Sequence, residues 1–384
     1  SGSPTSRPAT SDPRVLRFPD GLTAASFLAR HWQQAPLFMP GALERLKPSI
    51  SRNELAWLAT LDDVESRIVF TDRSGERLRY RAESGPFDDA FLAALPQRDW
   101  TLLVHDVEKH VPALRALFRQ VPFVPDWRID DLMISFAAPG GGVGPHSDHY
   151  DVFLCQGIGV REWRITGAEL QPDASASDDL ALLHEFEGTP FTAREGDVLY
   201  LPPGVAHWGT AHRACMTYSI GMRAPELADL APSLPDAPDH AAFYEDPDLS
   251  VDEAAPGFIS RHAAERARKL VADEHVSVDE AAMALGRCVT TTKQWLTPDT
   301  VSRTDAERIL ASVGQRGRLV VHGMARVAFD ADHVYVNGRS RALAPGASPT
   351  LAALCRSRHW RGPVPDDDEL VELLLWLLET GAFE

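Results

Sequence analysis

Two His-x-Asp pairs stand next to each other near the middle of the chain, His146-Ser147-Asp148 and His149-Tyr150-Asp151. One such pair is weak evidence for a metal site, because 14 histidines and 55 acidic residues produce pairs of this kind by chance. The two pairs are offset by an odd number of residues, so on an extended strand they would face opposite sides. At most one pair can therefore face the interior of a barrel.

The first pair has the better setting for a metal site. It follows the run PGGGVGP (residues 139–145), whose glycines permit a tight bend or a close approach of the backbone to a bound group. We expect the pair to begin a strand on which Tyr150, Val152 and Leu154 face the same side and line an interior.

A third ligand is available downstream, where the run GDVLYLPPGVAHWG (residues 196–209) predicts a strand and a Pro-Pro-Gly turn that deliver His207. Together with His146 and Asp148, this gives two imidazoles and one carboxylate. On one side of a metal these form a facial triad, which leaves positions open for a chelating cosubstrate and dioxygen on Fe(II). We predict Fe(II), although the same ligands also bind Zn, Mn or Ni.

A basic residue suited to such a cosubstrate follows on the next predicted strand. Arg161, in the run VREWRI, carries a planar guanidinium that pairs with a carboxylate through two hydrogen bonds, as the distal carboxylate of 2-oxoglutarate requires. Thr217 and Ser219 alternate on a later strand, CMTYSIGM, and offer hydroxyl groups to the same ligand.

The elements that position these residues are mostly short strands. Between residues 66 and 222 the chain consists of β-branched and aromatic runs separated by Gly, Pro and Asp, a pattern typical of an antiparallel barrel or a double-sheet jelly roll. Residues 20–60 are predicted to be helical, with Ser51 and Glu54 spaced as a capping box.

The pattern after residue 225 predicts helices and then a mixed unit. Ser277 and Glu280 begin one helix as a capping box, and a Pro- and Asp-rich stretch at residues 233–250 predicts a loop. Beyond residue 290, short strands, an Asn337-Gly338 hairpin turn and a closing helix at residues 366–380 indicate an α+β unit.

Composition limits the classes of partner. The formal net charge of −17 argues against a large non-specific nucleic-acid surface and suits a basic protein partner. No run of about 18 apolar residues predicts a membrane span, and the start of the chain (residues 1–14) lacks the features of a secretory signal. Four widely spaced cysteines are typical of a reducing compartment, so we expect a cytoplasmic protein.

The runs that carry this chemistry also carry a family resemblance. The segment DWRIDDLMISFAAPGGGVGPHSDHYDVFLCQGIGVREWRI, followed by GDVLYLPPGVAHWGTA and TYSIGMRAP, resembles the JmjC-type ribosomal oxygenases of the cupin superfamily, and among them the bacterial ribosomal-protein arginine hydroxylases. The resemblance implies a JmjC jelly-roll domain at residues 1–225, a helical dimerisation region at 226–289 and a winged-helix-like α+β domain at 290–384. It also implies a homodimer.

The resemblance assigns roles residue by residue. The expected roles are iron ligands at His146, Asp148 and His207, the basic 2-oxoglutarate residue at Arg161, its hydroxyl companions near Thr217 and Ser219, and a wall of the substrate pocket at Tyr150. In the family that the chain resembles, an Asn is expected in the strand where this chain has Thr217.

The function implied is Fe(II)- and 2-oxoglutarate-dependent hydroxylation of the β-carbon of an arginine in large-subunit ribosomal protein sixteen. The alternatives are a histidyl hydroxylase, another cupin metal enzyme that uses no 2-oxoglutarate, or a non-catalytic module that binds the ribosome or nucleic acid. The residues themselves do not choose among these targets.

Overall fold

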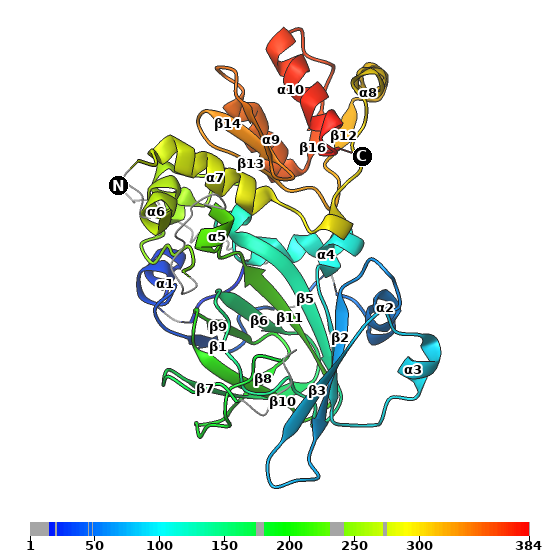
Figure 1. The fold of residues 1–384 in the computed structure, drawn as a ribbon, viewed down its shortest axis with the longest axis vertical. Coiled ribbons are helices and arrows are strands. Elements are labelled where there is room, and N and C mark those ends of the chain that lie inside the picture. Colours follow the sequence, from blue (N-terminus) through cyan, green and yellow to red (C-terminus); the bar gives the residue numbers. More distant parts are fainter. Residues whose placement is uncertain are drawn as a thin grey trace, which may run out of the picture.

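A jelly roll forms the centre of the protein, as predicted. The computed structural model describes residues 15–19, 21–44, 46–47, 49–173, 180–230, 242–271 and 275–383. Eight strands form an antiparallel sheet in the order β1-β9-β6-β11-β5-β4-β2-β3, and three more form a second sheet in the order β10-β7-β8 (Figure 1). The starting segment, residues 1–14, and part of the predicted loop, residues 233–241, lie outside the described ranges.

The strands of the two sheets have the following bounds: β1 Leu37–Met39, β2 Ser66–Asp72, β3 Arg79–Ser84, β4 Trp100–Val104, β5 Ile129–Ala137, β6 Val152–Gln156, β7 Val160–Thr166, β8 Phe191–Arg194, β9 Val198–Leu201, β10 Ala206–Ala211 and β11 Cys215–Met222. The short helices between them are α3 Asp89–Ala93, α4 Val107–His110, η1 Pro112–Gln120 and η2 Asp126–Arg128.

The two faces of the large sheet serve different purposes because side chains alternate along a strand. On β6, Phe153 and Cys155 enter the main hydrophobic core with the N-terminal helices α1 (Ala24–Arg30) and α2 (Arg52–Leu58). Val152 and Leu154 point the other way and pack with residues of β7, β8 and β9 between the two sheets. The interior that holds the predicted site is therefore the space between the sheets.

The expectation of helix over residues 20–60 is only partly right. Ser51 caps α2 and Glu54 completes the capping box, as predicted. Between the helices, however, the apolar run Leu37–Met39 forms β1, which pairs with the edge of the large sheet at β9. Tertiary pairing decides the state of such a short apolar run, and its local sequence does not.

The remaining helices and strands lie beyond the jelly roll. The helical region contains α5 Leu227–Leu230, η3 Val251–Glu253, α6 Arg261–Val271 and α7 Val278–Thr290. The C-terminal region contains η4 Gln294–Leu296, α8 Arg303–Arg316, β12 Arg318–Val320, β13 Val327–Phe329, β14 His333–Val336, β15 Arg339–Ala342, α9 Ser348–Ser357, β16 His359–Arg361 and α10 Asp368–Glu379.

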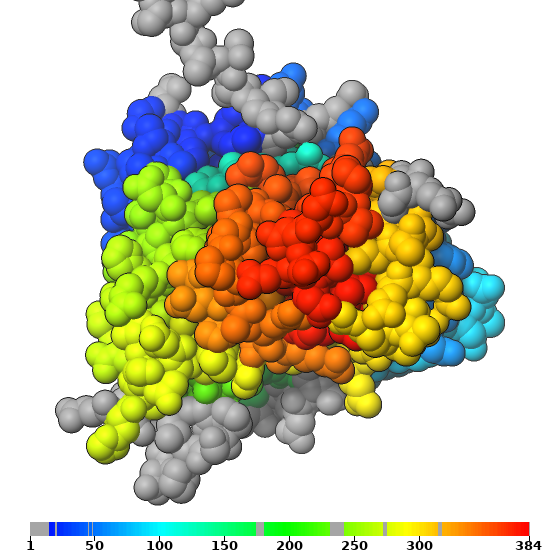
Figure 2. All heavy atoms as spheres, turned by 90° about the horizontal axis from the view of Figure 1, so that it is seen from above, coloured from blue at the N-terminus to red at the C-terminus, as the bar shows by residue number. Residues whose placement is uncertain are grey.

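The C-terminal region has the predicted α+β composition. Asn337 and Gly338 make the hairpin turn between β14 and β15, both with positive φ. Helices α8 and α9 were not predicted, whereas the closing helix α10 was. Figure 2 shows this region, in orange and red, lying beside the yellow-green helices α6 and α7.

The helical region joins the other two parts through shared packing. One buried cluster combines Trp127 beside the jelly roll, Leu285 of α7 and Tyr335 of β14. Gly286 of α7 lies so close to Tyr335 that an added Cβ would come within 2.4 Å of its ring. Within the described ranges, none of the helices combines the length and the apolar character that crossing a membrane requires.

Candidate active site

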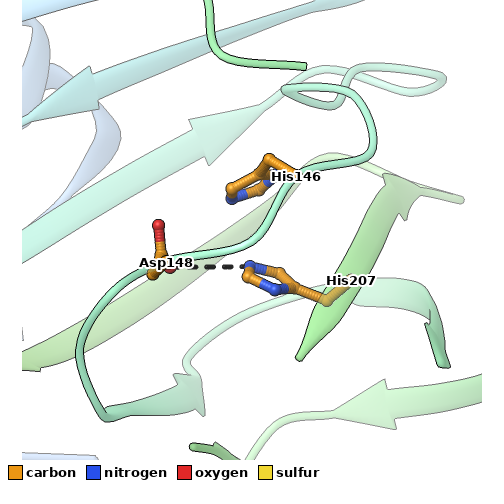
Figure 3. A group of neighbouring side chains, drawn as sticks. All are labelled: His146, Asp148 and His207. Carbon is orange, nitrogen blue, oxygen red and sulfur yellow. Dashed lines mark ion pairs between the residues drawn. The ribbon is translucent and has the colours of Figure 1, made fainter. Parts of the chain in front are cut away.

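The structure brings His146, Asp148 and His207 together in the space between the sheets (Figure 3). One ligand atom from each residue lies within 4.8 Å of the others. His207 Nε2 is 3.8 Å from Asp148 Oδ2, and the two imidazole rings have centroids 4.1 Å apart. Two nitrogens and one carboxylate oxygen therefore converge on one point.

Backbone pairing fixes the two histidines against each other. The His146 N–H donates to the carbonyl of His207 at 3.1 Å, and the His207 N–H donates to the carbonyl of His146 at 2.8 Å. The prediction that the first His-x-Asp pair begins a strand is wrong, because β6 starts only at Val152. The Asp148 carbonyl instead accepts from Gly204 N–H in the Pro-Pro-Gly turn at 2.8 Å, which holds this segment as a loop.

Both imidazoles are oriented by hydrogen bonds from their other ring nitrogen. His146 Nδ1 lies 2.9 Å from the Gly144 carbonyl, and His207 Nδ1 lies 3.0 Å from the Val205 carbonyl. These acceptors assign the proton to Nδ1 and leave Nε2 free to bind a metal. Burial, together with the neighbouring His146, lowers the pKa of His207 to about 4, so this ring is neutral at pH 7.

The second His-x-Asp pair faces away from this point. The His149 ring stacks on Phe243, with centroids 4.8 Å apart. Asp151 is fully buried, and its carboxylate accepts from Tyr200 Oη at 2.5 Å and from Gln33 Nε2 at 2.9 Å. Asp151 therefore serves the structural core behind the large sheet, whereas His149 is exposed.

Arg161 lies on β7 in a cavity of about 490 Å³ that also contains the three converging residues. Its side chain is buried, and its Nε and Nη2 have no hydrogen-bond partner in the described part of the chain. The guanidinium carbon is 5.5 Å from the centroid of the Trp163 ring. Because a buried charge without a partner is costly, this site calls for a bound anion.

The other predicted residues line the same cavity. Thr217 Oγ1 donates to Gln156 Oε1 at 3.2 Å, and Ser219 follows it on the same face of β11. Tyr150 is 40% exposed, which places it at the mouth.

Sequence reasoning missed a group of charged residues at the mouth of the cavity. Asp131 lies there, with its Oδ2 3.4 Å from His105 Nδ1. Lys293, from the segment after α7, bonds to Glu65 at 2.6 Å and to Asp106 at 2.7 Å. Because these residues are far apart in the chain, no spacing pattern connects them. The Asp130-Asp131 doublet at the start of β5 was the one local signal.

Comparisons with known proteins place this arrangement in context. The JmjC domain family matches residues 116–230. The chain is 34% identical over 385 residues to the ribosomal protein uL16 3-hydroxylase of Escherichia coli K12, covering 96% of this chain and 97% of that protein. It is 32% identical over 265 residues to a probable ribosomal oxygenase of Haemophilus influenzae, covering 67% of this chain and 62% of that protein.

Solved structures agree with the sequence comparison. An Escherichia coli ribosomal oxygenase in complex with cobalt and 2-oxoglutarate superposes with a TM-score of 0.70 at 28% identity, over 96% of this chain and 99% of that one. The same protein in complex with cobalt and succinic acid gives a TM-score of 0.70 at 30% identity over the same shares. The likeness thus extends through the helical and C-terminal regions.

Proposed function

The chain belongs to the JmjC ribosomal oxygenases, and we propose that it hydroxylates a side chain of ribosomal protein uL16, using Fe(II), dioxygen and 2-oxoglutarate. One observation carries the proposal. The His146, Asp148 and His207 ligand atoms converge in the same cavity as the buried, unpartnered guanidinium of Arg161. A metal and a dicarboxylate would each meet a matching set of groups there.

The three converging residues fit Fe(II). Two imidazoles and a carboxylate are the facial donor set of non-haem iron enzymes, and the hydrogen bonds from the two rings to backbone carbonyls hold the rings in place before any metal arrives. Bound there, Fe(II) supplies the redox chemistry that couples oxidation of 2-oxoglutarate to hydroxylation of the substrate. The protein's part is to hold both reactants beside the metal and to keep water away.

Arg161 fits the distal carboxylate of 2-oxoglutarate. Its two free nitrogens, Nε and Nη2, form one edge of the guanidinium fork and can bond both carboxylate oxygens. The hydroxyls of Thr217 and Ser219 lie on the facing strand and would contribute further hydrogen bonds to the same ligand.

The mouth of the cavity fits an arginine side chain. Among the described residues, the Asp131 carboxylate lies within 4 Å of a ring nitrogen of His105 but forms no ion pair with a lysine or arginine. Tyr150 lies beside it, since a Cβ on Gly221 would stand 3.1 Å from Asp131 Oδ1 and 3.9 Å from the Tyr150 ring. A guanidinium could pair with the carboxylate while it stacks on the ring. We therefore propose that the β-carbon of an arginine is the hydroxylated atom.

The division of the chain and its assembly are proposals that rest on the family. We place the catalytic domain at residues 1–225, a helical dimerisation region at 226–289 and a winged-helix-like domain at 290–384, and we propose a homodimer. A ribosomal protein substrate would place the enzyme in the cytoplasm. Light scattering of the purified chain tests the dimer directly, since a monomer mass at micromolar concentration would contradict it.

Activity is tested by loading the protein with Fe(II) without oxygen and then adding 2-oxoglutarate, air and a uL16 peptide. We expect succinate and a peptide heavier by one oxygen atom, with fragmentation placing that oxygen on arginine. Oxygen found on histidine would replace the target residue. Folded, iron-loaded protein that yields neither product would contradict the proposed function and favour a binding module.

A further inference from the structure

A second groove, of about 340 Å³, opens beside the mouth of the active-site cavity. It runs between the segments at residues 62–67 and 84–86 and ends at Trp295. Glu65, Arg67 and His105 line both the groove and the cavity, so the two adjoin.

We propose that this groove binds the basic polypeptide segment next to the hydroxylated residue, and that Trp295 is its main contact. The inference rests on the proposed function, because it takes the occupant to be the ribosomal protein substrate. It assigns a role in substrate selection to residues outside the metal and 2-oxoglutarate sites.

The charge of the groove suits a basic segment. In the part of the chain that the structure describes, neither Asp62 nor Asp63 forms an ion pair with a lysine or arginine. The charged neighbour of Asp63 would be His110, 4.0 Å away, but burial lowers the pKa of that histidine and favours its neutral form. Glu65, by contrast, is already paired with Lys293. Asp62 and Asp63 thus remain available to cations of a partner.

The groove also contains polar atoms that lack partners. Ser66 is 6% exposed and its Oγ has no hydrogen-bond partner among the described residues; the same holds for Arg67 Nε and His105 Nε2. All three residues line the groove. A buried polar group without a partner costs about 1–3 kcal/mol, and the carbonyls and amides of an extended polypeptide would satisfy them.

Trp295 is held in an exposed position by its neighbours. It is 54% exposed, while the next residue, Leu296, is 1% exposed and anchors the segment in the protein. The Leu296 N–H donates to the Lys293 carbonyl at 2.9 Å, and Arg223 Nη1 donates to the Thr291 carbonyl at 3.0 Å. Lys293 Nζ already lies 5.8 Å from the centroid of the indole, and the exposed remainder of the ring offers a surface beside carboxylates against which a lysine or arginine side chain of a partner can stack.

The test measures binding and turnover of two uL16 peptides centred on the same arginine, with the full-length protein. A short peptide of about five residues reaches roughly 7 Å from its centre, whereas one of about twenty residues reaches roughly 30 Å and can enter the groove. The variants are Trp295→Ala and the double variant Asp62→Asn/Asp63→Asn. Trp57→Ala is the matched control, because Trp57 is 59% exposed on α2 and does not line the groove.

We expect Trp295→Ala to raise both Kd and KM for the long peptide by about 5-fold to 30-fold, with little change in kcat, so that the long peptide loses its advantage over the short one. The double variant should weaken binding of the long peptide and reduce its dependence on salt. Trp57→Ala should behave as wild type.

The two proposals can fail separately. If wild type hydroxylates the long peptide, and Trp295→Ala and Trp57→Ala bind it with equal affinity, the proposed role of the groove is overturned and the proposed function stands. Loss of affinity in Trp295→Ala, with neither peptide hydroxylated by wild type, would support the groove and overturn the proposed function.

Discussion

Substituting Asp148 and Asp151 separately by alanine should separate chemistry from stability. Asp151 is fully buried, and its carboxylate lies 3.4 Å from Arg128 and accepts hydrogen bonds from Tyr200 and Gln33. Asp151→Ala removes one of the two carboxylates around Arg128 and leaves the Tyr200 hydroxyl without its acceptor. Breaking a buried ion pair costs about 3–5 kcal/mol. Asp148→Ala removes only a carboxylate at the edge of the cavity.

The assay is urea unfolding of the metal-free proteins, followed by peptide hydroxylation under conditions where each variant is folded. We expect Asp151→Ala to lose about 3–5 kcal/mol of unfolding free energy, and Asp148→Ala to lose less than about 1 kcal/mol. Hydroxylation should be abolished in Asp148→Ala, whereas folded Asp151→Ala should retain it. The reasoning is refuted if Asp151→Ala is as stable as wild type, or if Asp148→Ala keeps full activity.

Three further predictions follow from the structure. Arg161→Ala should raise the KM for 2-oxoglutarate by roughly 100-fold, since about 3 kcal/mol of charge-assisted hydrogen bonding is lost. Arg161→Lys should raise this KM less. An unchanged KM in Arg161→Ala would show that Arg161 does not bind the cosubstrate. Burial raises the pKa of Glu108 to about 7, so between about pH 4.5 and 7 the folded state holds a proton that the unfolded state has released. The free energy of unfolding should therefore fall as pH rises through this range. Urea titrations of Glu108→Gln should show a smaller dependence on pH. Gly286→Ala should cost about 1–3 kcal/mol in the same assay, because the new Cβ would clash with the buried Tyr335 ring; a more stable variant would show that this contact can relax.

The jelly roll was predictable because alternation is a local property of the sequence. On β11, Thr217 and Ser219 face the cavity while Met216 and Tyr218 enter the core, as strand parity requires. The two His-x-Asp pairs do face different ways, as predicted, but strand parity is not the reason, because the first pair lies on a loop and not on a strand. The glycine run before His146 was therefore a better guide to the site than the expected strand.

The residues that escaped prediction are those brought together by tertiary structure alone. Asp131, Lys293 and Trp295 reach one rim from β5 and from the segment after α7. Lys293 looks like an ordinary surface lysine in the sequence, and its two carboxylate partners, Glu65 and Asp106, come from two distant loops. Likewise, β1 exists because β9 offers it an edge, and no local signal could reveal that pairing.

The distribution of charge along the cavity predicts the sequence in which 2-oxoglutarate and the proposed basic substrate bind. On β11, Thr217 pairs with the end of β6 that leads into β7 and Arg161, whereas Gly221 pairs with the opposite end, beside Tyr150 and Asp131. Burial follows the same direction, from 1% exposure at Thr217 and 4% at Arg161 to 40% at Tyr150. The cationic end is thus deep and the acidic end is open. If Arg161 binds 2-oxoglutarate as proposed, this dicarboxylate must pass the mouth to reach it. A basic side chain already bound at the mouth would block that path, so we predict that 2-oxoglutarate binds first.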